Sequence, residues 1–160
     1  MTGRRPVVRL RRATESDADL LLAWSNDGAT RAASFHPEPI EQAGHLHWLA
    51  AILASPTTGF WIGEADGRPV GQVRVEIVAH EVGEISISIA PEARGAGLGR
   101  DLLVAATAEA GEVLPISTLL ARVRVDNPAS LALFAGAGFV ERGQTTCAGV
   151  PCAEFELQLA

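Results

Sequence analysis

A glycine-rich turn between a strand pattern and a helix pattern is the feature of this sequence that most restricts its fold. The segment from Ile89 to Leu103 reads IAPEARGAGLGRDLL, in which Pro91 ends the strand pattern and Leu98 begins the helical one. The amides of a helix's first turn have no partners within the helix, and the helix dipole is positive there. A strand-to-helix turn of this kind therefore predicts an anion-binding site.

The residue types in the turn favour a pyrophosphate as the anion. Glycines permit positive φ and a close approach of the backbone to a ligand, and arginines pair with phosphate oxygens. The turn holds three glycines and two arginines: Gly95, Gly97, Gly99, Arg94 and Arg100. A dinucleotide-binding fold is disfavoured, because the spacing is not G-x-G-x-x-G and a long stretch of other structure precedes the turn.

The patterns before the turn predict a strand, two helices and three further strands. Val7 to Arg11 alternates as a strand, and Thr14 with Asp17 predicts a capping box for a helix through Trp24. A second helix is predicted from Pro39 to Ser55. Its apolar stripe would consist of Ile40, Ala43, Leu46, Leu49, Ile52 and Leu53. The strands follow at Gly59 to Ala65, Val70 to Val78 and Glu84 to Ile89, the first two joined by the turn Asp66-Gly67.

The patterns after the turn complete a mixed sheet with helices on its faces. A helix is predicted from Leu98 to Gly111, and a strand from Leu119 to Val125. Asn127 is the expected N-cap of a short helix that ends near Gly136 or Gly138. Val150 to Leu159 is the closing strand. The order of elements predicts an α/β (α+β) fold.

The composition excludes several kinds of chemistry. All 13 basic residues are arginines, so no lysine forms a Schiff base, and without tyrosine no phenol serves as an acid or a base. A formal net charge of −6 and the lack of a dense basic face argue against nucleic acid as a partner. Cys147 and Cys152 match no metal signature and are predicted to be reduced packing residues, and no metal is expected. No signal peptide or membrane span is predicted, so we expect a cytoplasmic protein.

Two segments resemble the motifs of the GNAT superfamily of N-acetyltransferases. The run PEARGAGLGR after the strand ISISIA is similar to the acetyl-CoA loop of that family, and Arg94 to Gly99 match its pattern Q/R-x-x-G-x-G/A. Downstream, NPASLALFAGAGF from Asn127 to Phe139 resembles the second motif, an Asn-led helix that ends in Gly-Phe. The motifs stand in the family's order, and the likeness in the order of elements extends over roughly residues 7 to 159.

The resemblance implies both a fold and a co-substrate. The fold would be one acetyltransferase domain over residues 1–160, with a mixed, mostly antiparallel sheet of six to seven strands, splayed between its central strands, and about four helices. Acetyl-CoA would bind the motif at 87–103, its pantetheine arm paired with the backbone near Ile87 and Ile89, and the second motif at 127–139 would lie near the thiol. The implied contact residues are Ile87, Ser88, Ile89, Arg94, Gly95, Ala96, Gly97, Leu98, Gly99, Arg100, Asn127, Ser130 and Phe134.

Acetyl transfer needs a neutral amine as nucleophile, hydrogen-bond donors that stabilise the oxyanion, and a proton for the departing thiolate. A backbone N–H near Ile89 is the expected donor to the carbonyl. The family often has a tyrosine as general acid in the second motif, but the matching residue here is Phe134. A thiolate leaves tolerably well without a proton, so phenylalanine in place of tyrosine removes a proton donor without abolishing the reaction. Ser130 or a water is the alternative donor.

A carboxylate on the central strands is the expected base. Alternation places the polar side chains of each strand on one face: Gln72, Arg74 and Glu76 on the first strand, and Glu84, Ser86 and Ser88 on the second. Glu76 is the first candidate because it lies in mid-strand, and Glu84 and His80 are the others. The other interpretation is an ion pair of Glu76 with Arg74 or another arginine.

The first two helices usually cover the acceptor in this family. The arrangement W-x-N-D, then Arg, then H-x-x-W resembles enzymes that acetylate nucleotide-linked amino sugars, and a second branch is the ribosomal-protein N-terminal acetyltransferases. Tryptophan stacks on sugars and bases, amides bind hydroxyls and arginine meets phosphate. The predicted acceptor residues are Trp24, Asn26, Arg31, Trp48 and Arg74, with core packing as the other interpretation of the tryptophans.

We therefore predict an acetyl-CoA-dependent N-acetyltransferase that acts on the primary amine of a small molecule, such as a nucleotide-linked amino sugar. A protein N-terminal acetyltransferase and a non-catalytic acyl-CoA-binding module are the alternatives. The expected partner is a small-molecule amine, without nucleic acid or membrane. The strand from Val150 to Leu159 is a candidate edge for a homodimer, which is common in the family.

Overall fold

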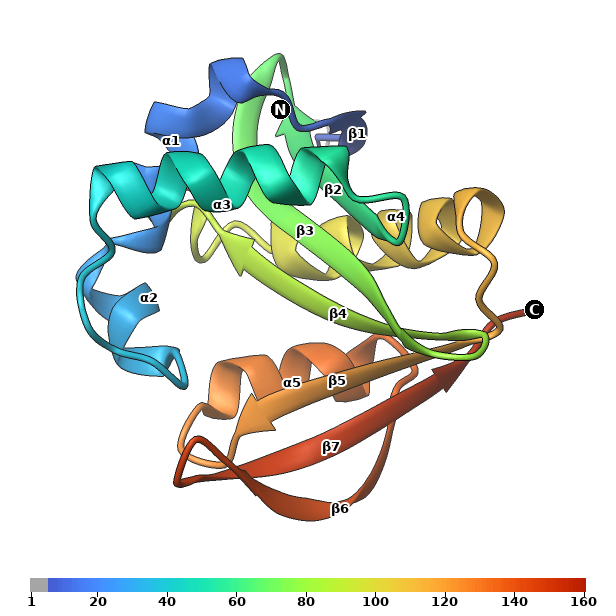
Figure 1. The fold of residues 1–160 in the computed structure, drawn as a ribbon. Coiled ribbons are helices and arrows are strands. Elements are labelled where there is room, and N and C mark those ends of the chain that lie inside the picture. The colour runs from blue at the N-terminus through green and yellow to red at the C-terminus, as the bar shows by residue number, and fades with distance from the viewer. Residues whose placement is uncertain (1–5) are drawn as a thin grey trace, which may run out of the picture.

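A seven-stranded sheet forms the centre of the computed structural model, which describes residues 6–160 (Figure 1). The strand order is β1-β2-β3-β4-β5-β7-β6, and every neighbouring pair is antiparallel except β4 and β5. The strands are β1 (Arg9–Arg12), β2 (Thr58–Ala65), β3 (Arg68–Ala79), β4 (Val82–Ile89), β5 (Thr118–Arg124), β6 (Val140–Cys147) and β7 (Val150–Gln158). The mixed, mostly antiparallel sheet predicted from the sequence is confirmed.

Residues 6–160 form five α-helices, one more than the roughly four expected. They are α1 (Ala18–Ser25), α2 (Gly28–Ala33), α3 (Gln42–Ala54), α4 (Leu98–Val113) and α5 (Pro128–Gly136). Short 3-10 turns at Glu15–Asp17 and Pro91–Ala93 precede α1 and α4. The predicted capping box of Thr14 and Asp17 is present at the first of these turns.

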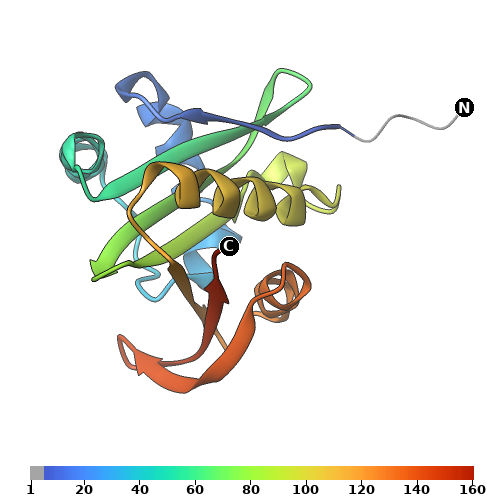
Figure 2. The same ribbon diagram turned by 90° about the vertical axis from the view of Figure 1, so that its right-hand side faces the viewer.

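The helices lie on both faces of the sheet, and each face has its own apolar core (Figure 2). On one face, α4 packs on side chains of β3, among them the fully buried Val73 and Val75, and α5 packs beside it on β5 and on Phe155 of β7. On the other face, α1 and α3 pack on Phe60 and Ile62 of β2. Strand alternation thus divides apolar residues between two layers, while Arg74 and Glu76 share the α3 face with Phe60.

The sheet splays between its central strands. β4 and β5 pair only from Val82–Glu84 to Thr118–Leu120, and Figure 1 shows the two strands diverging beyond that point. The remaining length of β4, up to Ile89, has no partner strand on its β5 side. This is the splay that the family resemblance implied.

The segment before α3 differs from the prediction. The helix begins at Gln42 and not near Pro39, because the side chain of Asn26 binds both the N–H and the C=O of Ile40 at 2.8 Å and holds that backbone outside the helix. The buried residues of α3 are His45 and Leu49, whereas Leu46 of the predicted stripe is 46% exposed. The six-residue helix α2 was not predicted.

Other boundaries also differ. α4 continues past Gly111 to Val113, so this glycine does not end the helix. β7 lies between β5 and β6 and is not an edge strand; the edges are β1 and β6, and β6 is exposed along nearly its whole length. Within residues 6–160, no helix is both long and apolar enough to cross a membrane. The predicted homodimer stays a prediction.

Candidate functional site

The glycine-rich turn has the backbone conformation that its sequence predicts. Gly95 and Gly97 have φ values of 80° and 74°, in the left-handed region that favours glycine, and Gly97 is the N-cap of α4. Gly99 differs from the prediction because it is already helical. A Cβ atom there would lie 3.4 Å from Leu133, so this glycine allows α4 and α5 to approach each other closely.

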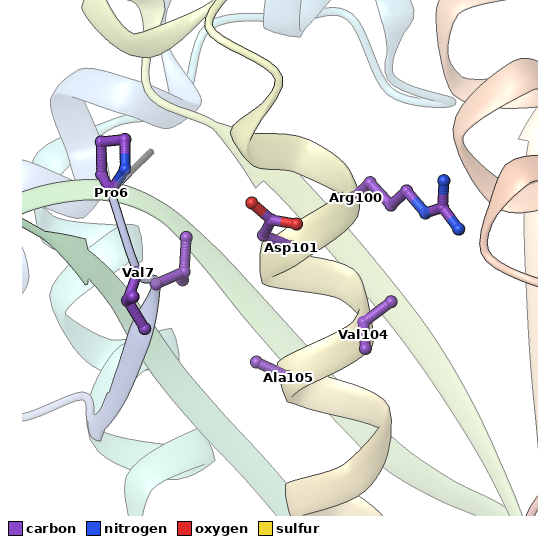
Figure 3. A pocket seen from close by; sticks show the side chains of 7 residues that line it. Pro6, Val7, Arg100, Asp101, Val104 and Ala105 are labelled. Atoms are coloured by element: carbon purple, nitrogen blue, oxygen red, sulfur yellow. The ribbon is translucent and has the colours of Figure 1, made fainter. Parts of the chain in front are cut away.

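The turn presents an anion-binding helix terminus. α4 has 16 residues, and its first-turn amides and dipole favour negative charge at Leu98 to Arg100. Figure 3 shows an open groove between the chain before β1 and α4, and the Arg100 side chain points away from it. That groove is lined by Pro6, Val7, Val8, Arg100, Asp101, Val104 and Ala105 and lies on the side of α4 remote from α5. It is therefore separate from the site described here.

Arg94 of the turn binds the first residues of α2. One of its terminal nitrogens lies 2.8 Å from Asp27 Oδ2 and 2.9 Å from Thr30 Oγ1. Asp27 also caps α2 by accepting the Thr30 amide, and these contacts, that of Arg94 first, hold the pKa of its carboxyl below the usual value. The remaining N–H groups of Arg94 leave it able to contact an anion on the turn.

The open side of β4 presents the backbone of alternate residues. Ala90 donates its N–H to Val70 of β3, so residues 86, 88 and 90 point their backbone groups at β3. By the same alternation, the amides of Ile87 and Ile89 point toward the gap before β5. The hydroxyl of Ser88 is buried and has no hydrogen-bond partner among residues 6–160. An extended chain that carries amide groups would hydrogen-bond to this open edge of β4. The pantetheine arm of CoA is a chain of that kind.

The second motif forms the predicted helix with Asn127 as its N-cap, and Phe134 lies in the core. Asn127 accepts the Ser130 amide at 3.3 Å and caps α5, and Pro128 occupies the first turn. Ser130 is half-buried. Phe134 is only 4% exposed and packs against Phe139 and Phe155, so its ring belongs to the core.

The two candidate bases lie side by side on the α3 face. Glu76 and Glu84 are cross-strand partners, and Glu84 is the residue at which β4 and β5 separate. Glu76 is exposed and, among the described residues, forms no ion pair, so the expected pair with Arg74 is not formed. Arg122 of β5 lies 3.8 Å from Glu84 and 3.5 Å from Glu154, and the charge of Glu84 is the main cause that raises the pKa of Arg122.

Three of the five predicted acceptor residues have side chains that are buried or hydrogen-bonded within the fold. Trp24 is 3% exposed and packs in the α1–α3 core. Asn26 binds the backbone of Ile40, and Arg31 binds the carbonyls of Ser25 and His36. Their burial and bonding indicate that these side chains hold the segment between α1 and α3 in place.

Trp48 and Arg74 lie together on the α3 face of the sheet. The Trp48 ring is half-buried between Phe60, edge-on at 5.9 Å, and the Arg74 guanidinium, whose Cζ lies 5.2 Å from the ring centre. Burial lowers the pKa of Arg74, and the nearby charges of Glu76 and Glu84 oppose that effect. The face therefore combines an aromatic ring, a half-buried cation and two carboxylates.

Two contributors were missed in the sequence. Asp27 caps α2, and the spacing of Asp27 and Thr30 is the signal that would have shown it. Arg124 binds Asp126 in a bidentate pair and donates to the Ser34 carbonyl at 2.8 Å, which ties the end of β5 to the loop after α2. No local pattern predicts that contact, because Ser34 and Arg124 are far apart in the chain. Within residues 6–160, no three metal-ligating side chains gather.

Comparison with known proteins agrees with this geometry. A sequence model described as an acetyltransferase (GNAT) domain matches residues 8–140. The fold is shared with a spermidine N-acetyltransferase from Vibrio cholerae solved with CoA and spermine, at a TM-score of 0.86 and 21% identity over 95% of each chain. It is also shared with an aminoglycoside acetyltransferase solved with coenzyme A and kanamycin, at a TM-score of 0.83 and 20% identity over 94% of each chain. The family model spans both motifs and most of the sheet, and the chain belongs to the GNAT acetyltransferase family.

Proposed function

We propose that this protein transfers an acetyl group from acetyl-CoA to the primary amine of a small-molecule acceptor. The observation that carries the proposal is the junction of two open backbone surfaces: the N-terminus of α4 and the unpaired edge of β4. The first suits a pyrophosphate and the second an extended amide chain. CoA joins these two groups in that order, and the proteins solved with the same fold bind CoA.

The chain's own groups account for cofactor binding. The amides from Gly97 to Arg100 would hold the pyrophosphate, with Arg94 and Arg100 adding charge. The amides of Ile87 and Ile89 and the hydroxyl of Ser88 would bind the pantetheine arm. Asn127 and Ser130 at the start of α5 would lie across the slot from β4.

The bound cofactor supplies a thioester, whose carbonyl is activated when a β4 amide donates to its oxygen. Glu84 lies where the strands separate, whereas Glu76 lies one strand farther from the slot. We therefore place Glu84 before Glu76 as the group that accepts the proton of the attacking amine, reversing the order expected from the sequence. Since phenylalanine at position 134 has no hydroxyl to donate a proton, the thiolate leaves unprotonated or takes a proton from Ser130 or water.

Within this function, an amino group on a nucleotide-linked sugar is the first candidate acceptor and a peptide N-terminus the second. Arg74, whose guanidinium lies over the Trp48 ring, supports the nucleotide-linked sugar, because arginine binds phosphate oxygens. The spermidine and aminoglycoside acetyltransferases that share the fold add polyamines and aminoglycosides to the candidates.

A thiol-release assay with acetyl-CoA tests the proposal. Panels of amino sugars, nucleotide-linked amino sugars, peptides, amino acids and polyamines serve as acceptors, and melting temperature is measured with and without CoA. Free CoA above the hydrolytic background, together with a higher melting temperature, supports catalysis. A raised melting temperature without thiol release in any panel supports a non-catalytic acyl-CoA-binding module instead. No effect of CoA in either measurement refutes both.

A further inference from the structure

Arg74 differs from the other half-buried arginines of the described chain. Between residues 6 and 160 these are Arg11, Arg31, Arg74 and Arg124. Arg11 forms a bidentate pair with Asp17, Arg31 binds backbone carbonyls, and Arg124 binds Asp126 and the Ser34 carbonyl. For Arg74 the structure shows only the contact with the Trp48 ring within that range. Its N–H donors therefore have no protein acceptor there.

The environment of Arg74 leaves its charge only partly balanced. Partial burial removes water from a group with five N–H donors, which is unfavourable unless other partners replace it. Glu76 and Glu84 stand on the same face at neighbouring positions, yet their charges do not cancel the effect of desolvation, and the pKa of Arg74 lies below its usual value. The guanidinium carbon of Arg74 lies over the Trp48 ring, and this cation–π contact supplies no oxygen or nitrogen acceptor for the N–H groups, which stay available to a further group.

Arg74 lies near Glu84, the proposed acceptor of the amine proton. Its cross-strand partner on β4 is Ser86, two residues along the strand from Glu84, where β4 and β5 separate. Arg74 and Glu84 are therefore diagonal neighbours on one face, and such residues lie about 7–8 Å apart in an antiparallel pair. A small molecule whose amine lies at Glu84 therefore extends over β3 and brings its other substituents within reach of Arg74.

We propose that Arg74, held on the Trp48 ring, determines acceptor specificity, and that the acceptor is a primary amine that also carries a carboxylate or a phosphate. The inference rests on the proposed acetyl transfer and narrows its substrate class. The N–H edges of a guanidinium match two oxygens of either anion. A polycationic acceptor would meet Arg74 as a like charge, so this site disfavours polyamines.

Matched acceptor pairs test the proposal on the full chain at saturating acetyl-CoA. Leucine with leucinamide isolates a carboxylate, glucosamine 6-phosphate with glucosamine isolates a phosphate, and spermidine represents polycations. We expect kcat/KM for the anionic member of at least one pair to exceed that of its neutral counterpart by about 10- to 100-fold, mainly through KM. The pair with the larger ratio identifies the anion. Equal values within both pairs, or spermidine as the best acceptor, overturns the proposal.

Variants separate recognition from a structural role. Arg74→Gln should lower kcat/KM for the anionic member much more than for the neutral member, and Arg74→Lys should recover part of the preference because it keeps the charge without the planar fork. Arg68→Gln, at an exposed arginine that begins β3, is the matched control and should behave as the parent protein. An equal loss for both members of a pair would show that Arg74 only supports the fold.

The outcome for Arg74 stays separate from that for catalysis. If no acceptor releases thiol, the proposed function fails, and titration calorimetry of the same pairs against the CoA-saturated chain then tests recognition alone. Tighter binding of an anionic member, lost in Arg74→Gln, supports the proposal. Equal binding within each pair, or no binding, overturns it.

Discussion

Ser88→Ala should stabilise the free protein and weaken its affinity for CoA. The Ser88 hydroxyl is buried without a hydrogen-bond partner among residues 6–160. Burying an unpaired hydroxyl costs about 1–3 kcal/mol, and alanine removes that cost while leaving a space smaller than a water. We expect a net gain of about 1 kcal/mol, which for a chain of this size raises the melting temperature by about 2–4 °C.

The effect on the complex has the opposite sign. A neutral hydrogen bond from the hydroxyl to the pantetheine arm contributes about 0.5–1.5 kcal/mol, so its loss should raise the Kd of CoA by about 2- to 10-fold. Differential scanning calorimetry of the free protein and titration calorimetry with CoA measure the two effects. Ser86→Ala, two residues earlier on the same face and exposed, is the control and should change neither.

Either result alone can refute the reasoning. A lower melting temperature for Ser88→Ala would mean that the hydroxyl is bonded within the fold. An unchanged Kd would mean that the pantetheine arm does not run along this part of β4. Because the stabilisation that CoA gives depends on its Kd, the weaker binding should make the CoA-induced shift of melting temperature smaller in the variant than in the parent protein.

Three further predictions concern the turn, an ion pair and a thiol. Gly95→Ala places a Cβ at a φ of 80°, in otherwise open space, so it should cost about 1–2 kcal/mol of backbone strain without a clash and weaken CoA binding measured by calorimetry. Asp17 accepts two hydrogen bonds from Arg11, the main cause that lowers its pKa, so its contribution to stability is complete above the unfolded-state pKa and disappears as the pH falls through the folded-state value. Urea unfolding should therefore show Asp17→Asn to be less stable than the parent at pH 7, and the difference should shrink below about pH 4; a difference independent of pH would contradict the assignment. Burial raises the pKa of Cys152 to about 11, so a thiol reagent at pH 8 should modify half-buried Cys147 first and Cys152 only after unfolding, and equal rates in the native protein would count against this.

Most of the fold follows from local patterns. The turn Asp66-Gly67 has positive φ at both residues, as a two-residue hairpin requires, and this sets the register of β2 and β3. The start of α3 could not be predicted from Pro39, because a side chain from another element, Asn26, binds the backbone that the helix would have used. α2 is too short to show a periodic apolar face, and none of its residues is buried.

The cofactor half of the site was more predictable than the acceptor half. Backbone binding needs only a turn, a helix start and a strand edge, which glycine spacing and alternation indicate directly. Acceptor recognition depends on which side chains remain unbonded after folding. Arg31 and Arg74 are the same residue type near the same face, yet one binds backbone carbonyls and the other has only an aromatic neighbour among the described residues. Tertiary contacts decide that difference, so residue type alone could not.

The chain from Asp27 to Ser34 connects the two sides of the splay. Arg94, after β4, binds Asp27 at its start, and Arg124, at the end of β5, binds the Ser34 carbonyl at its end. An anion on the glycine-rich turn can bind the N–H groups of Arg94 that Asp27 and Thr30 leave available, or it can draw the guanidinium away from Asp27. In the second case the anion and Asp27 compete for Arg94, so a weaker Asp27 contact would strengthen anion binding at the turn. Added salt would reduce this coupling because it screens the ion pair between Arg94 and Asp27.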